Sequence, residues 1–385
     1  MSAYICPYCF RRSETDVVCF QCSNPACKDD STFNVPGPGL VRRLLGAKAP
    51  HVSLCPKCLQ YTGTRVCSDC HRVLPVGIEY HSSMVTAVVG GCNAGTSVYI
   101  GVLIQRMHEL CEQFNWSFMA LDDFTKQRYE KDFYEQLYKY RQVIDMTFPI
   151  SSTGLTEGWG VDNPLLYSLT MTQDRKSKTI MLPFFDTSGA DFGNGLVEEY
   201  HRYIYNAAGI ILFFDPLNIP EIHERVKFSL GTDDVIYAGG PPARDIIQRM
   251  VQLIYSRQQL ARNKKIEIPL AIVCSKIDLL MSILGKYPPV FWPSGHNGHF
   301  NLDDFRRNSD CIQSWIAEYD MQLMSATKCF KDVAFFGVSA LGQNPVMTPR
   351  ADGIYTQTLK SSPQPIRVED PLLWLLWENG FLKGR

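Results

Sequence analysis

The strongest constraint on the fold is a series of short apolar runs that begins near residue 80 and is spaced by helical stretches. Short, uniformly apolar runs are typical of strands that are buried on both faces, as in a parallel sheet covered by helices. The sequence therefore predicts an α/β fold with a mainly parallel sheet. The predicted strands are 84–89, 165–170, 180–185, 209–214, 268–273 and 333–338.

Helical patterns separate these strands. After the first strand, apolar residues recur with the spacing of one helix face; they are Tyr99, Leu103, Met107, Leu110, Cys111 and Phe114. A second helix is predicted at about 245–261. A C-terminal helix is predicted with Asp370 as its N-cap and Pro371 as its first helical residue. The segment 115–160 is long for a connection and rich in aromatic residues, so we expect it to include a helix.

Composition excludes some classes of protein. The chain has 385 residues, of which 38 are basic and 39 acidic, so its net charge of −1 does not suggest a general nucleic-acid binder. The longest apolar stretch, 207–214, is too short to span a bilayer, and residues 1–6 do not resemble a signal peptide. We therefore expect a soluble cytoplasmic protein with no membrane partner.

Cysteines dominate the first part of the chain. Of 14 cysteines, nine precede residue 71, mostly in Cys-x-x-Cys pairs. Paired thiolates suit tetrahedral zinc, and a segment so poor in apolar residues needs such a staple; an iron–sulfur or dithiol redox site is the alternative. We predict two zinc ions in a paired ribbon region at residues 1–78, followed by a second domain at 80–385.

Each zinc site is expected to use neighbouring cysteine pairs. The site within 55–70 would use Cys55, Cys58, Cys67 and Cys70. The site within 6–27 would use Cys6 and Cys9 with two of the next three cysteines. Spacing alone prefers Cys19 with Cys22, while a pair of Cys22 with Cys27 is also feasible.

A glycine-rich turn follows the first predicted strand, with the sequence Gly90-Gly-Cys-Asn-Ala-Gly-Thr-Ser97. A strand, a Gly-x-x-x-x-Gly turn and a helix in this order let backbone N–H groups wrap an anionic phosphate. Ser97 stands where a hydroxyl ligates Mg²⁺, but Thr96 stands where such loops carry a lysine, so a positive charge is missing. The expected phosphate contacts are Gly90, Asn93, Ala94, Gly95 and Thr96.

Three further segments each follow an apolar run. Asp186-Thr-Ser-Gly189 would place a carboxylate near Mg²⁺ and a glycine amide near the γ-phosphate. Ser275-Lys276-Ile-Asp278 would read guanine, because a carboxylate can accept hydrogen bonds from its N1–H and 2-amino groups while the lysine stem lies over the base. Ser339-Ala340-Leu341 would offer a backbone N–H to guanine O6.

Together these motifs resemble a known family. Residues 80–385 resemble a Ras-like, translation-factor-class P-loop GTPase domain, and the whole chain resembles the zinc-ribbon-bearing "double-GTPase" proteins of prokaryotic conflict and signalling systems. The second resemblance rests on the segments 6–10, 22–27, 67–75 and 368–374 and on the long insert before the second strand. It favours Cys22 and Cys27 as ligands over Cys19.

The resemblance also implies roles for individual residues. It makes Gly90, Gly95 and Ser97 phosphate-loop and magnesium residues, Asp186 and Gly189 the second switch, Lys276 and Asp278 base readers, and Ala340 the O6 contact. A switch-one threonine that also ligates Mg²⁺ should precede the second strand. Thr153 is the first choice, with Thr147 and Thr156 as alternatives.

Two departures from the family limit the expected activity. Thr96 replaces the phosphate-loop lysine, and Ala190 follows Gly189 where Ras-like enzymes place the glutamine that orients water. We expect a zinc-ribbon-tethered, GTP-binding switch with weak or partner-dependent hydrolysis, in which Thr153 and Asp191 are the candidate catalytic residues. The expected partner is a protein effector or regulator. The alternatives are a pseudo-GTPase scaffold and a ribbon protein that binds nucleic acid.

Overall fold

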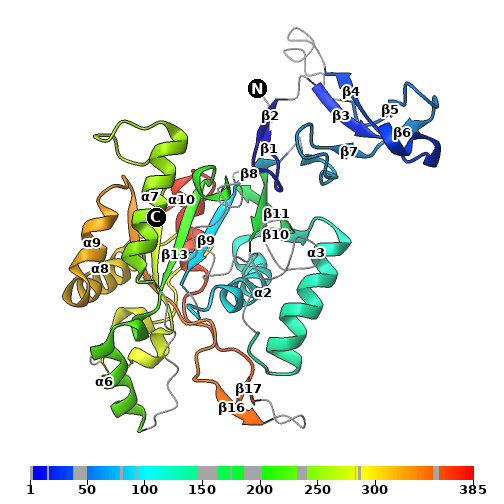
Figure 1. Ribbon diagram of the computed structural model, residues 1–385. Coiled ribbons are helices and arrows are strands. Elements are labelled where there is room, and N and C mark those ends of the chain that lie inside the picture. The colour runs from blue at the N-terminus through cyan, green and yellow to red at the C-terminus, as the bar shows by residue number, and fades with distance from the viewer. Residues whose placement is uncertain are drawn as a thin grey trace.

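Figure 1 shows a computed structural model of the chain, with the sheet and its helices in one body and the cysteine-rich region beside it. The structure describes residues 3–14, 17–37, 50–78, 81–91, 93–144, 163–173, 176–185, 202–231, 241–281, 283–284, 288–349 and 355–385. Within these residues, no helix has both the length and the apolar character needed to cross a bilayer.

The central sheet is mixed but largely parallel. Its strands follow the order β10-β11-β12-β9-β13-β14-β15, and β8 also pairs with β12. The pairs from β12 through β15 are parallel, whereas β10–β11 and β11–β12 are antiparallel. This confirms the predicted α/β fold class. The strands are β8 (Ser82–Ser83), β9 (Thr86–Gly90), β10 (Trp116–Ala120), β11 (Leu165–Gln173), β12 (Lys176–Phe184), β13 (Gly209–Phe214), β14 (Leu270–Cys274) and β15 (Val333–Gly337).

Helices cover both faces of the sheet, and alternate strand residues enter two separate cores. On β13, for example, Ile211 and Phe213 face one core, while Ile210, Leu212 and Phe214 face the other. Figure 1 shows α2 and α3 on one side of the sheet and α7, α8 and α9 on the other. The helices are α2 (Thr96–Phe114), α3 (Asp123–Arg128), α5 (Arg202–Tyr205), α6 (Pro220–Leu230), α7 (Ala243–Gln258), α8 (Leu302–Tyr319), α9 (Met321–Thr327) and α10 (Asp370–Glu378).

The segment that follows α2 contains more than the expected helix. It first forms β10, an added edge strand, and then α3, which continues as the π-helical segment η3 (Tyr129–Lys139). Trp116 and Phe118 of β10 are buried, so this edge strand packs on the core beside β11. The C-terminal helix starts one residue earlier than expected, because Glu369 is its N-cap and Asp370 is already helical.

The cysteine-rich region consists of short antiparallel sheets. β3 (Val17–Gln21) lies between β4 (Thr32–Pro36) and β7 (Arg65–Val66), while β1 (Ala3–Ile5) pairs with β2 (Arg12–Glu14) and β5 (Ser53–Leu54) with β6 (Tyr61–Thr62). Figure 1 shows β1 and β2 next to β8, where the Ser83 hydroxyl donates to the carbonyl of Ile5 at 3.3 Å. At the opposite end of the molecule, β16 (Val346–Pro349) and β17 (Tyr355–Thr358) form a projecting hairpin.

Candidate nucleotide and metal sites

The carboxyl ends of four parallel strands meet at one edge of the sheet. Gly90 of β9, Phe213 of β13, Val273 of β14 and Phe336 of β15 form one row of the ladder. β9 and β14 are two strand spacings apart, which is about 10 Å. The loops after these strands therefore open side by side, at the edge where open α/β sheets bind ligands.

The described residues of the glycine-rich turn need glycine or a left-handed backbone at several positions. A Cβ on Gly90 would lie 2.9 Å from the side chain of Thr96 and 3.0 Å from that of Phe213, so only glycine fits there. Asn93 and Gly95 have φ of 57° and 89°, and Gly95 caps α2 without a side-chain hydrogen bond. The first turn of α2 carries no acidic residue, so the positive end of its dipole is not neutralised by a neighbouring carboxylate.

The turn after β14 is held on both sides. The N–H of Ser275 donates to the carbonyl of Phe214 at 2.9 Å, and the N–H of Ile277 donates to that of Val338 at 3.2 Å. Between them, Lys276 adopts the left-handed conformation with φ 53° and ψ 35°. This conformation is uncommon for a residue with a side chain, so the neighbouring hydrogen bonds fix the direction in which the lysine leaves the backbone.

Asp278 is the second residue of the short helix η8 (Ile277–Leu280), and it is half-buried. Burial raises the pKa of Asp278, although the Ser339 hydroxyl and the nearby Lys276 charge act in the opposite direction. Because the N–H of Ile277 donates to the carbonyl of Val338, the structure brings the two predicted base-reading segments side by side.

The loop 339–341 is anchored from behind. Ser339 exchanges two backbone hydrogen bonds with Ile366, at 3.1 and 2.8 Å, and its hydroxyl accepts the N–H of Gly342 at 2.8 Å. Gly342 has φ 65°, and a Cβ there would lie 2.0 Å from the carbonyl oxygen of Gln364. Within the described parts of the chain, no backbone carbonyl accepts the N–H of Ala340.

Asp215 is a site residue that the sequence analysis missed. It follows β13 directly, between the glycine-rich turn and the Lys276 loop, and its side chain is fully buried. One carboxylate oxygen accepts from Lys276 Nζ at 2.7 Å, and the other accepts the N–H of Leu217 at 3.0 Å. The sequence did contain a signal for Asp215, because it directly follows an apolar run. The sequence analysis selected Asp186 for that same feature.

Several predicted residues lie outside the described parts of the chain. They include the second-switch segment and every candidate for the first switch, so the structure does not place them relative to the sheet edge. They are Asp186, Gly189, Ala190, Asp191, Thr147, Thr153 and Thr156, and Cys92 of the glycine-rich turn is also among them.

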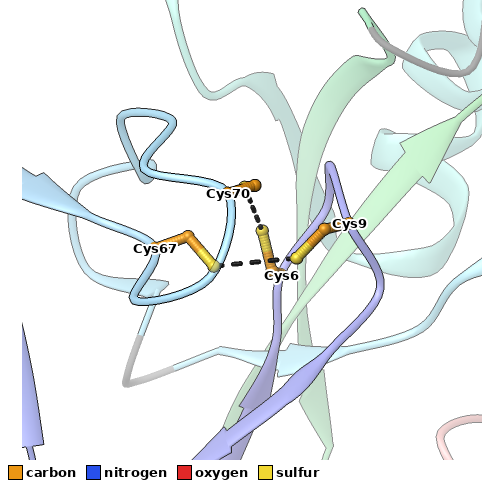
Figure 2. A group of neighbouring side chains, drawn as sticks. All are labelled: Cys6, Cys9, Cys67 and Cys70. Atoms are coloured by element: carbon orange, nitrogen blue, oxygen red, sulfur yellow. Dashed lines mark hydrogen bonds between the residues drawn. The ribbon is translucent and has the colours of Figure 1, made fainter.

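Eight cysteines gather in two clusters. We call the cluster formed by the first and last cysteine pairs of the chain the outer cluster. Figure 2 shows it, with Cys6 and Cys9 facing Cys67 and Cys70. The inner cluster consists of Cys22, Cys27, Cys55 and Cys58. Cys19 lies on β3, outside both clusters.

This arrangement corrects the grouping expected from chain order. The first cysteine pair shares a cluster with the last pair, and the second pair shares one with the third, so the clusters are nested. The reason is that β3 pairs with β7 through Cys19 and Val66. This pairing returns residues 65–70 to the first knuckle and leaves the two middle pairs to face each other.

Three of the four cysteine pairs share one knuckle geometry. Phe10, Leu59 and His71 each follow a Cys-x-x-Cys turn with φ between 56° and 60°. Each donates its N–H, at 3.0 Å, to the carbonyl of the first cysteine in its turn. In two of the pairs a backbone N–H also points at a thiol, from Asn24 to Cys22 and from Asp69 to Cys67, both at 3.4 Å.

The sulfur spacing fits tetrahedral zinc. A Zn–S bond of about 2.3 Å places tetrahedral sulfur ligands about 3.8 Å apart. The outer cluster has Sγ–Sγ distances of 3.8 Å for Cys6 and Cys70 and 3.7 Å for Cys9 and Cys67. The inner cluster has corresponding distances of 3.5 and 4.0 Å. Both clusters could therefore hold zinc.

The outer knuckle packs on the central sheet. Phe10 is 3% exposed, and its ring centroid lies 5.0 Å from that of Phe185 and 6.1 Å from that of Tyr203. Cys6 and Cys67 share a small core with Met181 of β12. The cysteine-rich region is therefore joined to the sheet through the fold of its outer cluster.

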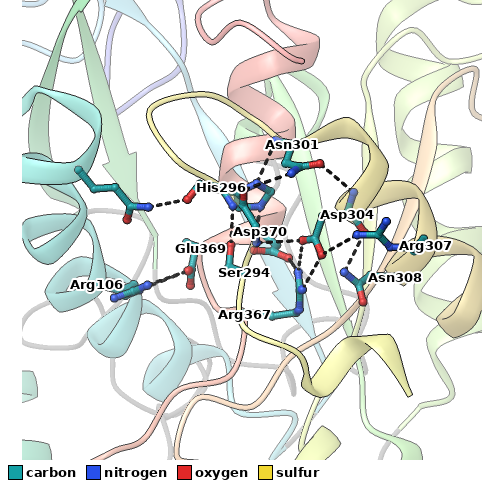
Figure 3. Close-up of polar contacts among 12 residues, drawn as sticks. Arg106, Ser294, His296, Asn301, Asp304, Arg307, Asn308, Arg367, Glu369 and Asp370 are labelled. Atoms are coloured by element: carbon teal, nitrogen blue, oxygen red, sulfur yellow. Dashed lines mark hydrogen bonds and ion pairs between the residues drawn. The ribbon is translucent and has the colours of Figure 1, made fainter. Parts of the chain in front are cut away.

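A buried network supports the 339–341 loop from behind (Figure 3). Arg367, next to Ile366, binds both oxygens of Asp304 at 2.8 and 3.0 Å and one oxygen of Asp370 at 2.7 Å. His296 Nε2 lies 3.2 Å from the other oxygen of Asp370. Because a guanidinium already occupies the space between the carboxylates, we assign an ion-pair network here and no metal.

Comparisons with known proteins do not establish a family. No protein-family model matches the chain. Among curated proteins, the chain is 26% identical over 235 residues to SaeC of Mycolicibacterium smegmatis, named as a proposed ESX-1 scaffolding and assembly protein. The match covers 61% of this chain and 56% of the relative, so the chain spans little more than half the length of the relative it matches.

The solved structures found by comparison are distant. One is Sup35 complexed with GDP, with a TM-score of 0.24, 14% identity and coverage of 68% of this chain and 38% of that one. Another is the Saccharomyces cerevisiae Ski7 GTPase-like domain bound to GTP, with a TM-score of 0.31, 16% identity and coverage of 77% and 50%. Scores this low do not support an argument about function, which rests instead on the geometry of the sheet edge.

Proposed function

We propose that this protein binds guanine nucleotide at the carboxyl edge of its sheet and acts as a nucleotide-controlled protein-interaction switch with zinc-stabilised N-terminal modules. The observation that carries the proposal is that the loop after β14, which holds Lys276 and Asp278, opens at the same sheet edge as the glycine-rich turn, about 10 Å from it. A base reader and a phosphate loop at this separation suit the two ends of one nucleotide.

The base would bind between the loops after β14 and β15. Asp278 would accept hydrogen bonds from the N1–H and 2-amino groups of guanine, and the Ala340 N–H would donate to O6. Adenine would present an acceptor at N1 to the carboxylate and an amino group to the Ala340 N–H, so both contacts disfavour it. Guanine selectivity is therefore the expected property of this edge.

The phosphates would bind on the turn from Gly90 to Gly95 and on the N-terminus of α2. Ser97 would ligate Mg²⁺, together with Asp186 and a threonine for which Thr153 is the candidate. Thr96 removes a charge-assisted contact, which is expected to cost about 1.5 to 3 kcal/mol, or roughly tenfold to a hundredfold in affinity. Binding should therefore be weaker than in a loop with lysine.

Hydrolysis is expected to be slow. The reaction would be attack of water on the γ-phosphate of GTP to give GDP and phosphate. Ala190 supplies no side chain that can orient the water, which leaves Asp191 or a group from a protein partner for that role. A slow reaction suits a switch whose state is set by exchange or by a partner.

A second candidate function is a scaffold that binds little nucleotide. Thr96 favours it, and so does the name of the relative SaeC, which refers to scaffolding and assembly. The exposed apolar side chains around the inner cluster, Leu59 at 69% and Tyr61 at 76% exposure, also suit protein contacts. The ion pair between Lys276 and the buried Asp215 and the position of Asp278 beside it argue for the switch, because a scaffold does not need residues that recognise a base.

Equilibrium binding of GTP, GDP and ATP with Mg²⁺ separates these functions. The switch predicts guanine-selective binding that is lost in Asp278→Ala, strengthened in Thr96→Lys, and unchanged in a control at the exposed Asp303, Asp303→Ala. Absence of binding by the natural chain, with a gain in Thr96→Lys, would favour the scaffold. Nucleotide binding without preference for guanine would contradict the proposed role of Asp278.

A further inference from the structure

The Asp215 carboxylate is the counter-ion of Lys276 at the sheet edge. Its side chain is fully buried, whereas that of Lys276 is 28% exposed, so the ammonium group turns inward and part of the stem remains open to solvent. A buried carboxylate requires a partner. Lys276 Nζ is that partner at 2.7 Å, and the remaining oxygen caps the turn after β13 by accepting from Leu217.

We propose that Asp215 is a positioning residue for recognition of the purine base. By binding Nζ, it stretches the Lys276 side chain across the base site, so that the four methylene groups form one wall beside Asp278. This inference rests on the proposed function. It adds a role in specificity for a residue that lies outside all of the expected guanine-binding motifs.

Two features of the geometry make this role effective. The backbone of Lys276 is fixed in the left-handed conformation by the hydrogen bonds of Ser275 and Ile277, and its Nζ is fixed by Asp215. Both ends of a flexible stem are thus held before a ligand arrives. Preorganisation of this kind raises affinity because the ligand does not have to order the side chain.

The ion pair also keeps Asp278 available. Lys276 lies close enough to Asp278 to influence its ionisation. Without Asp215, the free ammonium group would be drawn to Asp278 and would compete with the guanine N1–H and 2-amino groups for the same oxygens. With Asp215 present, the lysine charge is neutralised by Asp215, and the Asp278 carboxylate is left to bind the base.

The test is a double-mutant cycle on nucleotide binding. GDP, IDP and ADP affinities are measured with Mg²⁺ for the natural chain, Asp215→Asn, Lys276→Met and the double variant. Asparagine retains an oxygen for the Leu217 N–H, and methionine retains an unbranched stem without charge. Glu267→Gln is the matched control, because Glu267 and Lys331 form an ion pair whose side chains are 81% and 55% exposed.

Asp215→Asn is expected to lower GDP and IDP affinity by about 5- to 30-fold. The preference for GDP over IDP should also fall, because the freed ammonium group competes with the guanine 2-amino group for Asp278, and Asp278→Ala should remove that preference entirely. Asp215→Asn should have little further effect in the Lys276→Met background, because the role passes through the lysine. Glu267→Gln should bind like the natural chain.

Four results would overturn the inference. Unaltered GDP affinity in Asp215→Asn would remove the role of Asp215 alone, and so would an equal loss of affinity with and without Lys276, which marks a purely structural effect. If Asp215→Asn does not fold, natural GDP affinity in Lys276→Met has the same meaning. A natural chain that binds no guanine nucleotide overturns the proposed function and this inference together.

Discussion

The N–H of Ile277 donates to the carbonyl of Val338 at 3.2 Å, and so joins the loop that holds Asp278 to the loop that begins at Ser339. Ser339 is 2% exposed and is itself held by Ile366 and Gly342. The base reader is therefore positioned by a neighbouring loop and by the segment behind that loop. This dependence is the basis of the first two predictions.

GDP binding should weaken on acidification at a higher pH than an exposed aspartate would cause. Burial raises the pKa of Asp278 above its ordinary value, and only the ionised form accepts both guanine donors. Affinity is thus full above the raised pKa and is lost as the pH falls through it. The Ser339 hydroxyl lowers the pKa of Asp278, so Ser339→Ala should move the whole curve to higher pH.

The measurement is GDP affinity from neutral pH downward, with zinc content followed in parallel so that acid release of metal is recognised. Ser325→Ala, on the exposed side of α9, is the matched serine control. A Ser339→Ala curve that coincides with that of the natural chain would show that Ser339 does not control the ionisation of Asp278.

Gly342→Ala should weaken guanine binding by moving the 339–341 loop. The added Cβ would meet the Gln364 carbonyl at 2.0 Å, at a φ of 65°. The expected loss of unfolding free energy is about 2 to 4 kcal/mol, from left-handed strain and overpacking together. Gly231→Ala is the control, because Gly231 has a φ of 63° and open space at the Cβ position; it should lose about 1 to 2 kcal/mol and keep GDP affinity. Equal behaviour of the two variants would contradict the role of this contact.

Zinc stoichiometry of paired cysteine variants should reveal the nested clusters. The double variant Cys6→Ser with Cys67→Ser damages only the outer cluster, so about one zinc ion per chain should remain. Cys6→Ser with Cys22→Ser damages both clusters and should leave almost none. Grouping in chain order predicts the reverse for both variants, so metal analysis of the purified proteins decides between the two arrangements. The natural chain should hold about two.

Phe10→Ala should destabilise the protein by about 3 to 5 kcal/mol, because it leaves a cavity where the turn of residues 6–9 packs on the sheet. Leu59 occupies the same position in the inner knuckle but is 69% exposed. Leu59→Ala is therefore a matched control with an expected change within about 0.5 kcal/mol. Urea unfolding measures both variants, and equal stabilities would mean that the knuckle does not dock on the sheet through Phe10.

Arg367→Met should cost about 3 to 5 kcal/mol at neutral pH, since it removes the buried guanidinium that binds the carboxylates of both Asp304 and Asp370. Burial opposes ionisation of Asp304, but Arg367 outweighs this effect and lowers the pKa of Asp304. The natural chain therefore loses this stabilisation as the pH falls through the lowered pKa.

In Arg367→Met the buried Asp304 carboxyl group favours its protonated form, because burial then acts without the opposing guanidinium. Mild acid should therefore reduce the difference in unfolding free energy between the variant and the natural chain. Unfolding curves at several pH values test this. Arg306→Met, with a side chain that is 65% exposed, is the control, and a gap that stays constant with pH would refute the electrostatic explanation.

Local patterns predicted much of the architecture. Runs such as 209–214 became strands because a uniformly apolar segment is stable only when buried on both faces. The helix after Gly95 followed from a single apolar face, and the edge strand Trp116–Ala120 was missed because its short alternation lies next to a stronger helical pattern. The cysteine knuckles were also visible, since a Cys-x-x-Cys turn needs only neighbouring residues.

The sequence by itself determined most of the central strands and the helix after Gly95, and which residue types can bind phosphate, guanine or zinc, because each depends on residues a few positions apart. Only the tertiary structure decided which cysteine pairs could share a metal, that Asp215 holds Lys276, and that Ile277 bonds to Val338. These contacts join distant segments through strand pairing. Their partners are chosen by the register and order of the whole sheet, which no short stretch of sequence contains.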